Sequence, residues 1–398
     1  MSIRSEAHVA RRRSDDGGMA WLALGFRPFY LLAALLAAAA VPVWVAQFFG
    51  VLPQAGFVAP MAWHTHEMVF GFAVAVITGF LFTAVRNWTG LPTPTGRTLG
   101  ALASLWLLGR IFMLIGPGWA AAIADIAFLP AIAWFLWQPL RHVRNRNQFF
   151  VAILLLLAAL NAGFHLAHAG AITLTPIVWV HAALLLVVLV VAIMGGRVIP
   201  AFTRNAIPAA RMRSLPGIEA ASLATLAATL VAWTAGLPDA IVAMLAFATA
   251  LVHAIRLWSW NPWATRSSPI LWILHLSYAW IALGMLLLAV ALAGIAGSSS
   301  AAMHALGVGA VGGMIIGMIT RTARGHTGRP LEAEAAEVTA YILVQLAAAI
   351  RVFLPLLLPQ AYAFALVASA VLWSAAFATY CVVYWPILTR ARVDGKPG

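Results

Sequence analysis

Two histidines and a glutamate lie within one helical turn near the start of a long apolar stretch. The stretch covers 60–90 and reads PMAWHTHEMVFGFAVAVITGFLFTAVRNWTG, which places His64, His66 and Glu67 close to its beginning. Ionisable side chains are costly inside a membrane, so each of the three is a candidate for function. Neutral imidazole binds haem iron, copper and zinc without burying a charge. The pattern therefore favours a buried metal or haem centre.

Four more histidines occupy comparable positions near the ends of later apolar segments. They are His165, His168, His181 and His304. If the segments cross a membrane in alternate directions, all six histidines lie at one membrane level. A single histidine in a helix more often makes a structural hydrogen bond, but six on one level from four helices favour metal or haem binding.

Helical geometry limits which of these side chains can share a metal. His64, Glu67 and Met68 are expected on one helical face, whereas His66 lies about 200° round the helix. The two histidines should therefore serve different centres. Met68 offers either a thioether ligand or core packing. Glu67 either handles protons and orients a ligand, or accepts hydrogen bonds from a neighbouring helix.

Two arginines lie inside apolar segments rather than between them. Arg110 could pair with a haem propionate, but we expect it to pair with Asp125, because the turn at 116–118 folds one segment onto the next. Arg351 has no acid nearby in the sequence, so we assign it to a haem propionate. His165 and His168 are three residues apart and can face one partner.

The composition identifies a polytopic membrane protein. Hydrophobic residues make up 63% of the chain and charged residues only 9%, which excludes a soluble domain with one core. At about 20 residues per crossing, the sequence predicts an all-α bundle of about twelve spans. The apolar segments lie at 28–49, 61–85, 98–116, 119–138, 149–169, 173–195, 216–236, 239–256, 269–293, 300–320, 337–358 and 361–387. Cys381 is the only cysteine, which excludes an internal disulfide and a covalently attached haem.

The basic residues test this topology independently. Lys and Arg fall in alternate connections, so the positive-inside rule places both termini in the cytoplasm. The net charge of +13 follows from this distribution, and we do not interpret it as a nucleic-acid-binding surface. The expected organisation is a disordered basic tail at 1–18, a membrane domain at 19–389 and a second tail at 390–398.

Three segments repeat a pattern of Gly, Thr, Arg and Asn or His. They are GFLFTAVRNWTG (79–90), GRVIPAFTRN (196–205) and GMITRTARGHTG (317–328). Each ends a span at the inner side, roughly 33 Å from the outer histidines at ~1.5 Å per residue. The alternatives are anchoring at the membrane edge and a separate inner site. The residues of that possible inner site are Arg86, Arg204, His275, Arg324 and His326.

Several blocks of the sequence resemble the NnrS family. They are GFRPFYLLAA (25–34), WHTHEMVFGFAVAVITGFLFTAVRNWTG (63–90), NAGFHLAH (161–168), MGGRVIPAFTRN (194–205), WILHLSYAW (272–280) and HALGVGAVGGMIIGMITRTARGHTGRPL (304–331). The resemblance implies a multi-pass protein of the bacterial inner membrane that contains haem and copper. It also implies a role in nitric oxide metabolism and in resistance to nitrosative stress.

From this resemblance we expect haem b and copper as cofactors, and nitric oxide or a nitrosyl species as the molecule acted on. The first-choice ligands are His64, His66, His181 and His304, and the second-choice ligands are His165 and His168. Glu67 is the candidate for proton handling. The alternatives to a haem–copper oxidoreductase are a transporter of a metal or iron–nitrosyl species and a non-catalytic haem sensor.

Overall fold

The computed structural model describes residues 19–295 and 297–396. The predicted tail at 1–18 lies outside these residues, as do 397–398 of the second tail. Within the described ranges, all regular secondary structure is helical. Twelve spans there are long and apolar enough to cross a membrane. The all-α prediction is confirmed, and the chain is a multi-pass membrane protein.

The spans follow the predicted apolar segments closely. Their bounds are α2 (Phe26–Phe48), α3 (Pro60–His66) continuing through η2 (Glu67–Ala73) and α4 (Val74–Thr89), α5 (Gly96–Ile115), α6 (Gly118–His142), α7 (Phe149–His168), α8 (Pro176–Ala206), α9 (Pro216–Thr234), α10 (Asp239–Ser259), α11 (Pro269–Leu292), α12 (Ser299–His304) continuing through η5 (Ala305–Gly312) and α13 (Gly313–His326), α14 (Ala335–Leu357) and α15 (Tyr362–Thr389).

Local sequence explains where many helices begin and end. Pro60 and Pro176 occupy first helical positions, where the missing N–H costs nothing. Gly90 ends α4 with φ of 68°, a left-handed conformation that favours glycine. The largest difference between a predicted segment and its helix is at α8, which continues to Ala206 although the apolar segment ends at 195. The helical hydrogen bonds persist there after the apolar composition ends.

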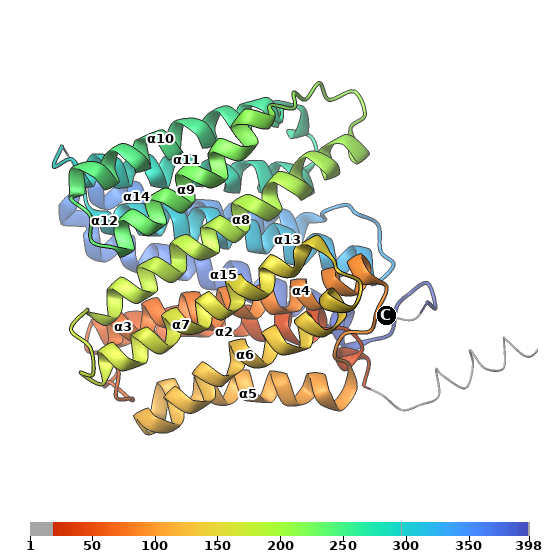
Figure 1. Ribbon diagram of the computed structural model, residues 1–398, viewed down its shortest axis with the longest axis horizontal. Coiled ribbons are helices and arrows are strands. Elements are labelled where there is room, and N and C mark those ends of the chain that lie inside the picture. The colour runs from red at the N-terminus through yellow and green to blue at the C-terminus, as the bar shows by residue number, and fades with distance from the viewer. Residues whose placement is uncertain (1–18, 296, 397–398) are drawn as a thin grey trace, which may run out of the picture.

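Two spans form the centre of the bundle. The helices run side by side along the long axis, with α5 and α6 at one edge and α9 and α10 at the opposite edge (Figure 1). Each span contains an apolar stretch of 18 residues. In Pro60–Thr89 and Ser299–His326, 83% and 78% of that stretch is buried inside the bundle, against 22% in α9. The first span carries three candidate side chains and the second carries His304. The bundle therefore places these candidates in its interior.

Both central spans contain a π-helical segment. The first, η2, begins directly after His66, and the second, η5, begins directly after His304. A π-helix bonds residue i to i+5 and changes the direction in which the following side chains point. Such segments occur often at functional sites. The candidate histidines thus stand where the helical geometry becomes irregular.

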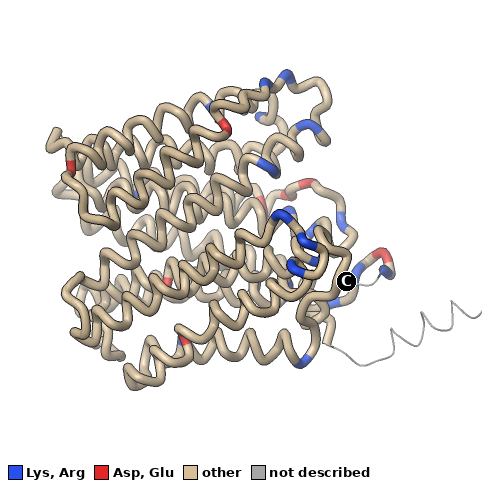
Figure 2. Tube along the Cα trace, in the orientation of Figure 1, with Lys and Arg blue, Asp and Glu red and all other residues tan. Residues whose placement is uncertain are grey.

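Basic side chains gather at one end of the bundle. Figure 2 shows Lys and Arg concentrated at the end where the chain terminates, while α3 and α12 lie at the opposite end (Figure 1). The positive-inside rule predicts that the basic end faces the cytoplasm. The candidate histidines of α3 and α12 are consequently at the other side of the membrane in the predicted orientation.

The packing of η5 against α11 gives a first prediction. A Cβ on Gly309 would clash with the indole of Trp280, whereas a Cβ on Gly307 would meet nothing within 4 Å. We expect Gly309→Ala to lower stability by about 1–3 kcal/mol through overpacking. Gly307→Ala is the matched control and should be neutral or slightly stabilising. Thermal unfolding in one detergent measures both, and equal melting temperatures would contradict the packing described.

Candidate functional site

A cavity between the two central spans and α8 brings three candidate histidines together. Its volume is about 130 Å³, and its wall is mostly apolar. The imidazoles that line it are His64 from α3, His181 from α8 and His304 from α12. They come from sequence positions more than a hundred residues apart. Three of the candidate histidines, from different helices, therefore line one cavity.

The surroundings of two of these imidazoles leave ring nitrogens available to a ligand. The Nδ1–H of His304 donates to the carbonyl oxygen of Ser300 at 2.7 Å, so its Nε2 carries a free lone pair. His64 stacks on Trp44, with 3.9 Å between ring centroids and 17° between planes. Its Nδ1 is buried and has no hydrogen-bond partner among the described residues. Such orphaned polar atoms call for a partner that binds there.

Arg351 adds a positive charge to the same cavity. The side chain, from α14, is 7% exposed and its guanidinium lies 5.4 Å from the ring of Tyr362. Among the described residues that line the cavity, none is a carboxylate. A buried guanidinium without a neighbouring acid is suited to an anionic group of a bound molecule.

The expected face shared by His64, Glu67 and Met68 is only partly correct. Met68 lines the cavity with His64, as predicted. Glu67 does not, because the π-helical segment begins at this residue and Arg110 holds its carboxylate on another side. The guanidinium Nη1 of Arg110 donates to Glu67 Oε1 at 2.8 Å.

Glu67 belongs instead to a second, fully buried cluster beside the cavity. We call it the acid–histidine cluster. Its members are His66, Glu67, Arg110, Asp125, Asn161 and His165. Each side chain is at most 7% exposed. His64 and His66 therefore face different surroundings, although only one residue separates them.

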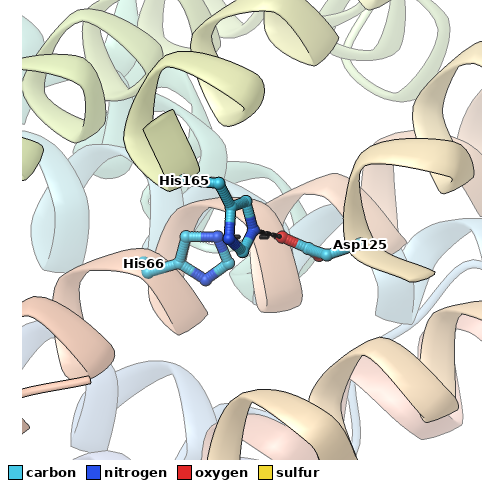
Figure 3. Close-up of side chains that lie close together, drawn as sticks. All are labelled: His66, Asp125 and His165. Carbon is cyan, nitrogen blue, oxygen red and sulfur yellow. Dashed lines mark hydrogen bonds and ion pairs between the residues drawn. The ribbon is translucent and has the colours of Figure 1, made fainter. Parts of the chain in front are cut away.

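Asp125 is the centre of this cluster. Its Oδ2 lies 3.0 Å from His66 Nε2 and 3.0 Å from His165 Nε2, and Figure 3 shows both rings directed at this carboxylate. Its Oδ1 accepts a hydrogen bond from Arg110, so the predicted Arg110–Asp125 ion pair is confirmed. Asn161 donates from Nδ2 to Asp125 Oδ2 at 2.8 Å.

Asn161 was missed from the sequence. It stands four residues before His165 on α7, so the two side chains share a helical face. That spacing was the available signal. His168 is half-buried on the same helix but packs against the rings of Phe57 and Phe164, away from Asp125.

The proposed inner residues do not come together. Arg86 and Arg204 are exposed. His275 hydrogen-bonds to Thr203 Oγ1 at 3.0 Å, which fits a structural role. Arg324 pairs with two carboxylates at the start of α14, those of the N-cap residue Glu334 and of Glu337 in the first turn.

An inner cavity exists nonetheless, and the three repeated segments line it. Its volume is about 380 Å³, and α4, α8 and α13 form its wall. The basic groups in its wall are His326, which was predicted, and Arg321, which was not. Arg321 lies with its guanidinium carbon 3.9 Å from the ring centroid of Phe202. The repeated segments therefore line a cavity, but none of the three arginines chosen from them, Arg86, Arg204 and Arg324, is in its wall.

The ion pairs of Arg110 give a second prediction. Arg110→Met would leave the carboxylates of Glu67 and Asp125 buried without their cation, which costs about 3–5 kcal/mol. Arg141→Met is the control, because Arg141 is exposed and contacts the ring of Trp137. We expect a large fall in melting temperature only for the Arg110 variant. Comparable melting curves for both variants would show that the cluster is not held by this ion pair.

Comparison with known proteins agrees with the resemblance found in the sequence. No curated protein matches the chain. The family model described as NnrS protein matches residues 20–392 of the 398, and the chain therefore belongs to the NnrS family.

Proposed function

We propose that the chain is a haem- and copper-binding protein of the bacterial inner membrane that acts on nitric oxide and protects against nitrosative stress. Membership of the NnrS family supports a connection with nitric oxide and with metal or haem binding. The observation that carries the proposal is the cavity in which His64, His181 and His304 meet beside Arg351.

The side chains that line the cavity suit a haem, although the cavity of about 130 Å³ has to widen to admit the macrocycle. Neutral imidazole is a common axial ligand of haem iron, and the wall supplies three of them. The remaining wall is mostly apolar, which suits the macrocycle, and Arg351 provides a guanidinium for a propionate. When bound, the haem supplies an iron that ligates diatomic gases and exchanges single electrons.

The residues of the chain then control access and position. His304, with Nδ1–H fixed on Ser300, presents Nε2 to the cavity. Trp44 holds the ring plane of His64 by stacking. Nitric oxide is small and apolar, so it reaches a site inside the bilayer without a polar channel. The surrounding apolar wall excludes water and hydrophilic competitors.

The distribution of charge supports a periplasmic location for this cavity. The basic end of the bundle, which carries the C-terminus (Figure 2), faces the cytoplasm in the orientation that we propose. The cavity between α3, α8 and α12 then lies in the opposite half. Both termini are cytoplasmic in this orientation.

Single substitutions of the cavity histidines test the proposal. We expect His64→Ala, His181→Ala or His304→Ala to lower the haem content of purified protein, because each removes an imidazole that would ligate the iron. The control is His168→Ala, whose ring packs on Phe57 outside the cavity. Optical absorbance in the Soret region, normalised to protein, measures the haem. Full haem content in all three cavity variants would overturn the assignment.

A second candidate function is transport of a metal or nitrosyl species, and one observation favours it. Beyond the histidine cavity, an apolar cavity lies along α4, α8 and α13, and it shares Phe80, Met194, Val198 and Met318 with the inner cavity. The spans Pro60–Thr89 and Ser299–His326 and the helix α8 thus line cavities from the histidine end of the bundle to the inner end. Uptake of iron–nitrosyl complex into vesicles containing the protein would support transport, and absence of uptake would favour the haem protein.

A further inference from the structure

We propose that His66, Asp125 and His165 bind one transition-metal ion at a site separate from the haem cavity. The inference concerns the acid–histidine cluster, and it rests on the proposed function only in naming copper as the preferred ion. Two imidazoles and a carboxylate also suit zinc and other first-row metals.

The three donor atoms have the spacing of a coordination site. His66 Nε2, His165 Nε2 and a carboxylate oxygen of Asp125 all lie within 4.8 Å of one another. The two separations from Asp125 Oδ2 are each 3.0 Å. Metal bonds of about 2.0–2.2 Å in a tetrahedral site hold neighbouring ligand atoms about 3.3 Å apart. Small side-chain movements would therefore admit an ion.

The partners of the His66 ring place its Nε2 lone pair against two oxygen acceptors. The Nδ1–H faces Glu67 Oε1 at 3.2 Å and donates to it. On the other side of the ring, Nε2 faces Asp125 Oδ2 and Asn161 Oδ1, at 3.0 Å and 2.9 Å. Both oxygens are acceptors, since Asn161 directs its Nδ2 to Asp125. A lone pair among acceptors is unfavourable unless a cation lies between them.

The net charge of the acid–histidine cluster also favours a bound cation. Glu67 and Asp125 bring two negative charges, and Arg110 brings one positive charge. With neutral imidazoles, the buried cluster keeps one uncompensated negative charge, which is costly in a low-dielectric interior. A metal ion at Asp125 offsets that charge. A second proton on His66 would also offset the charge. Metal analysis distinguishes a bound ion from this proton.

The surroundings orient a ligand in the way that metal sites require. Ligating histidines usually donate their other N–H to a carboxylate, which fixes the ring and its tautomer. Glu67 occupies this position for His66, and Arg110 in turn fixes Glu67. Gly71 leaves room for both, because a Cβ there would come within 2.9 Å of Glu67 Oε2 and 3.1 Å of Arg110 Nη1. Glu67 is thus a positioning residue.

The experiment is a metal titration of the full-length protein in detergent. The protein is stripped with a chelator, loaded with Cu(II) alone or Zn(II) alone, desalted and assayed for metal and for haem. Wild-type protein should retain one more metal ion per chain than His165→Gln or Asp125→Asn. The matched control is His168→Ala, three residues away on α7, which should behave as the wild type. Elution as a single sharp peak in gel filtration confirms that a variant is folded.

Two further readouts distinguish the possible outcomes. Glu67→Gln should retain the ion but bind it about 10- to 100-fold more weakly, as expected for a lost orienting partner. The Soret absorbance should be unchanged in His165→Gln, so failure of the haem proposal and failure of this one are separable. Equal metal content in wild type, His165→Gln and Asp125→Asn would overturn the metal site and leave a proton on His66 as the compensating charge.

Discussion

The structure depends on the buried guanidinium of Arg110, which bridges two carboxylates from different helices. It joins α5 to Glu67 of η2 and to Asp125 of α6. Breaking a buried ion pair on one side typically costs about 3–5 kcal/mol, so this contact fixes the relative positions of the three segments. Because His66 contacts both of these carboxylates and His165 contacts that of Asp125, it also determines where two of the histidines lie. Structural stability and the candidate metal site share the same atoms.

Two candidate sites lie on one segment, at the point where the helix type changes. The helical hydrogen-bonding pattern changes at Glu67, directly after the two histidines. His64 and Met68 face the cavity and His66 faces Asp125, as ideal helical geometry expects, whereas Glu67 departs from that expectation and faces Arg110. The second central span has a corresponding change after His304. A short motif can thus supply two neighbouring sites without a loop in the membrane.

Much of the fold was predictable because apolar composition and charge distribution are strong signals in membrane proteins. The twelve spans and the Arg110–Asp125 pair followed from segment length and from the turn between α5 and α6. The meeting of His64, His181 and His304 followed from their common level. Their exact grouping did not, because it depends on how helices rotate about their own axes.

The sequence was less informative where geometry departs from the ideal α-helix. Glu67 was placed with His64 because the π-helical segment has no simple sequence signature. Asn161 was overlooked because an amide in an apolar helix is ordinary until its partners are known. At the inner end, Arg86 and Arg204 are exposed, as the alternative of anchoring at the membrane edge expects, whereas Arg321 lines the cavity. A sequence repeat indicates which part of a helix is involved, but not which side of the helix faces the cavity.

The most direct test of the central claim is an optical spectrum of the purified wild-type protein, oxidised and reduced, before and after addition of nitric oxide. The account predicts a Soret band that shifts when the gas is added, because a haem in the cavity of His64, His181 and His304 is accessible from the bilayer. A colourless preparation that contains neither iron nor copper, from cells supplied with haem, would contradict it.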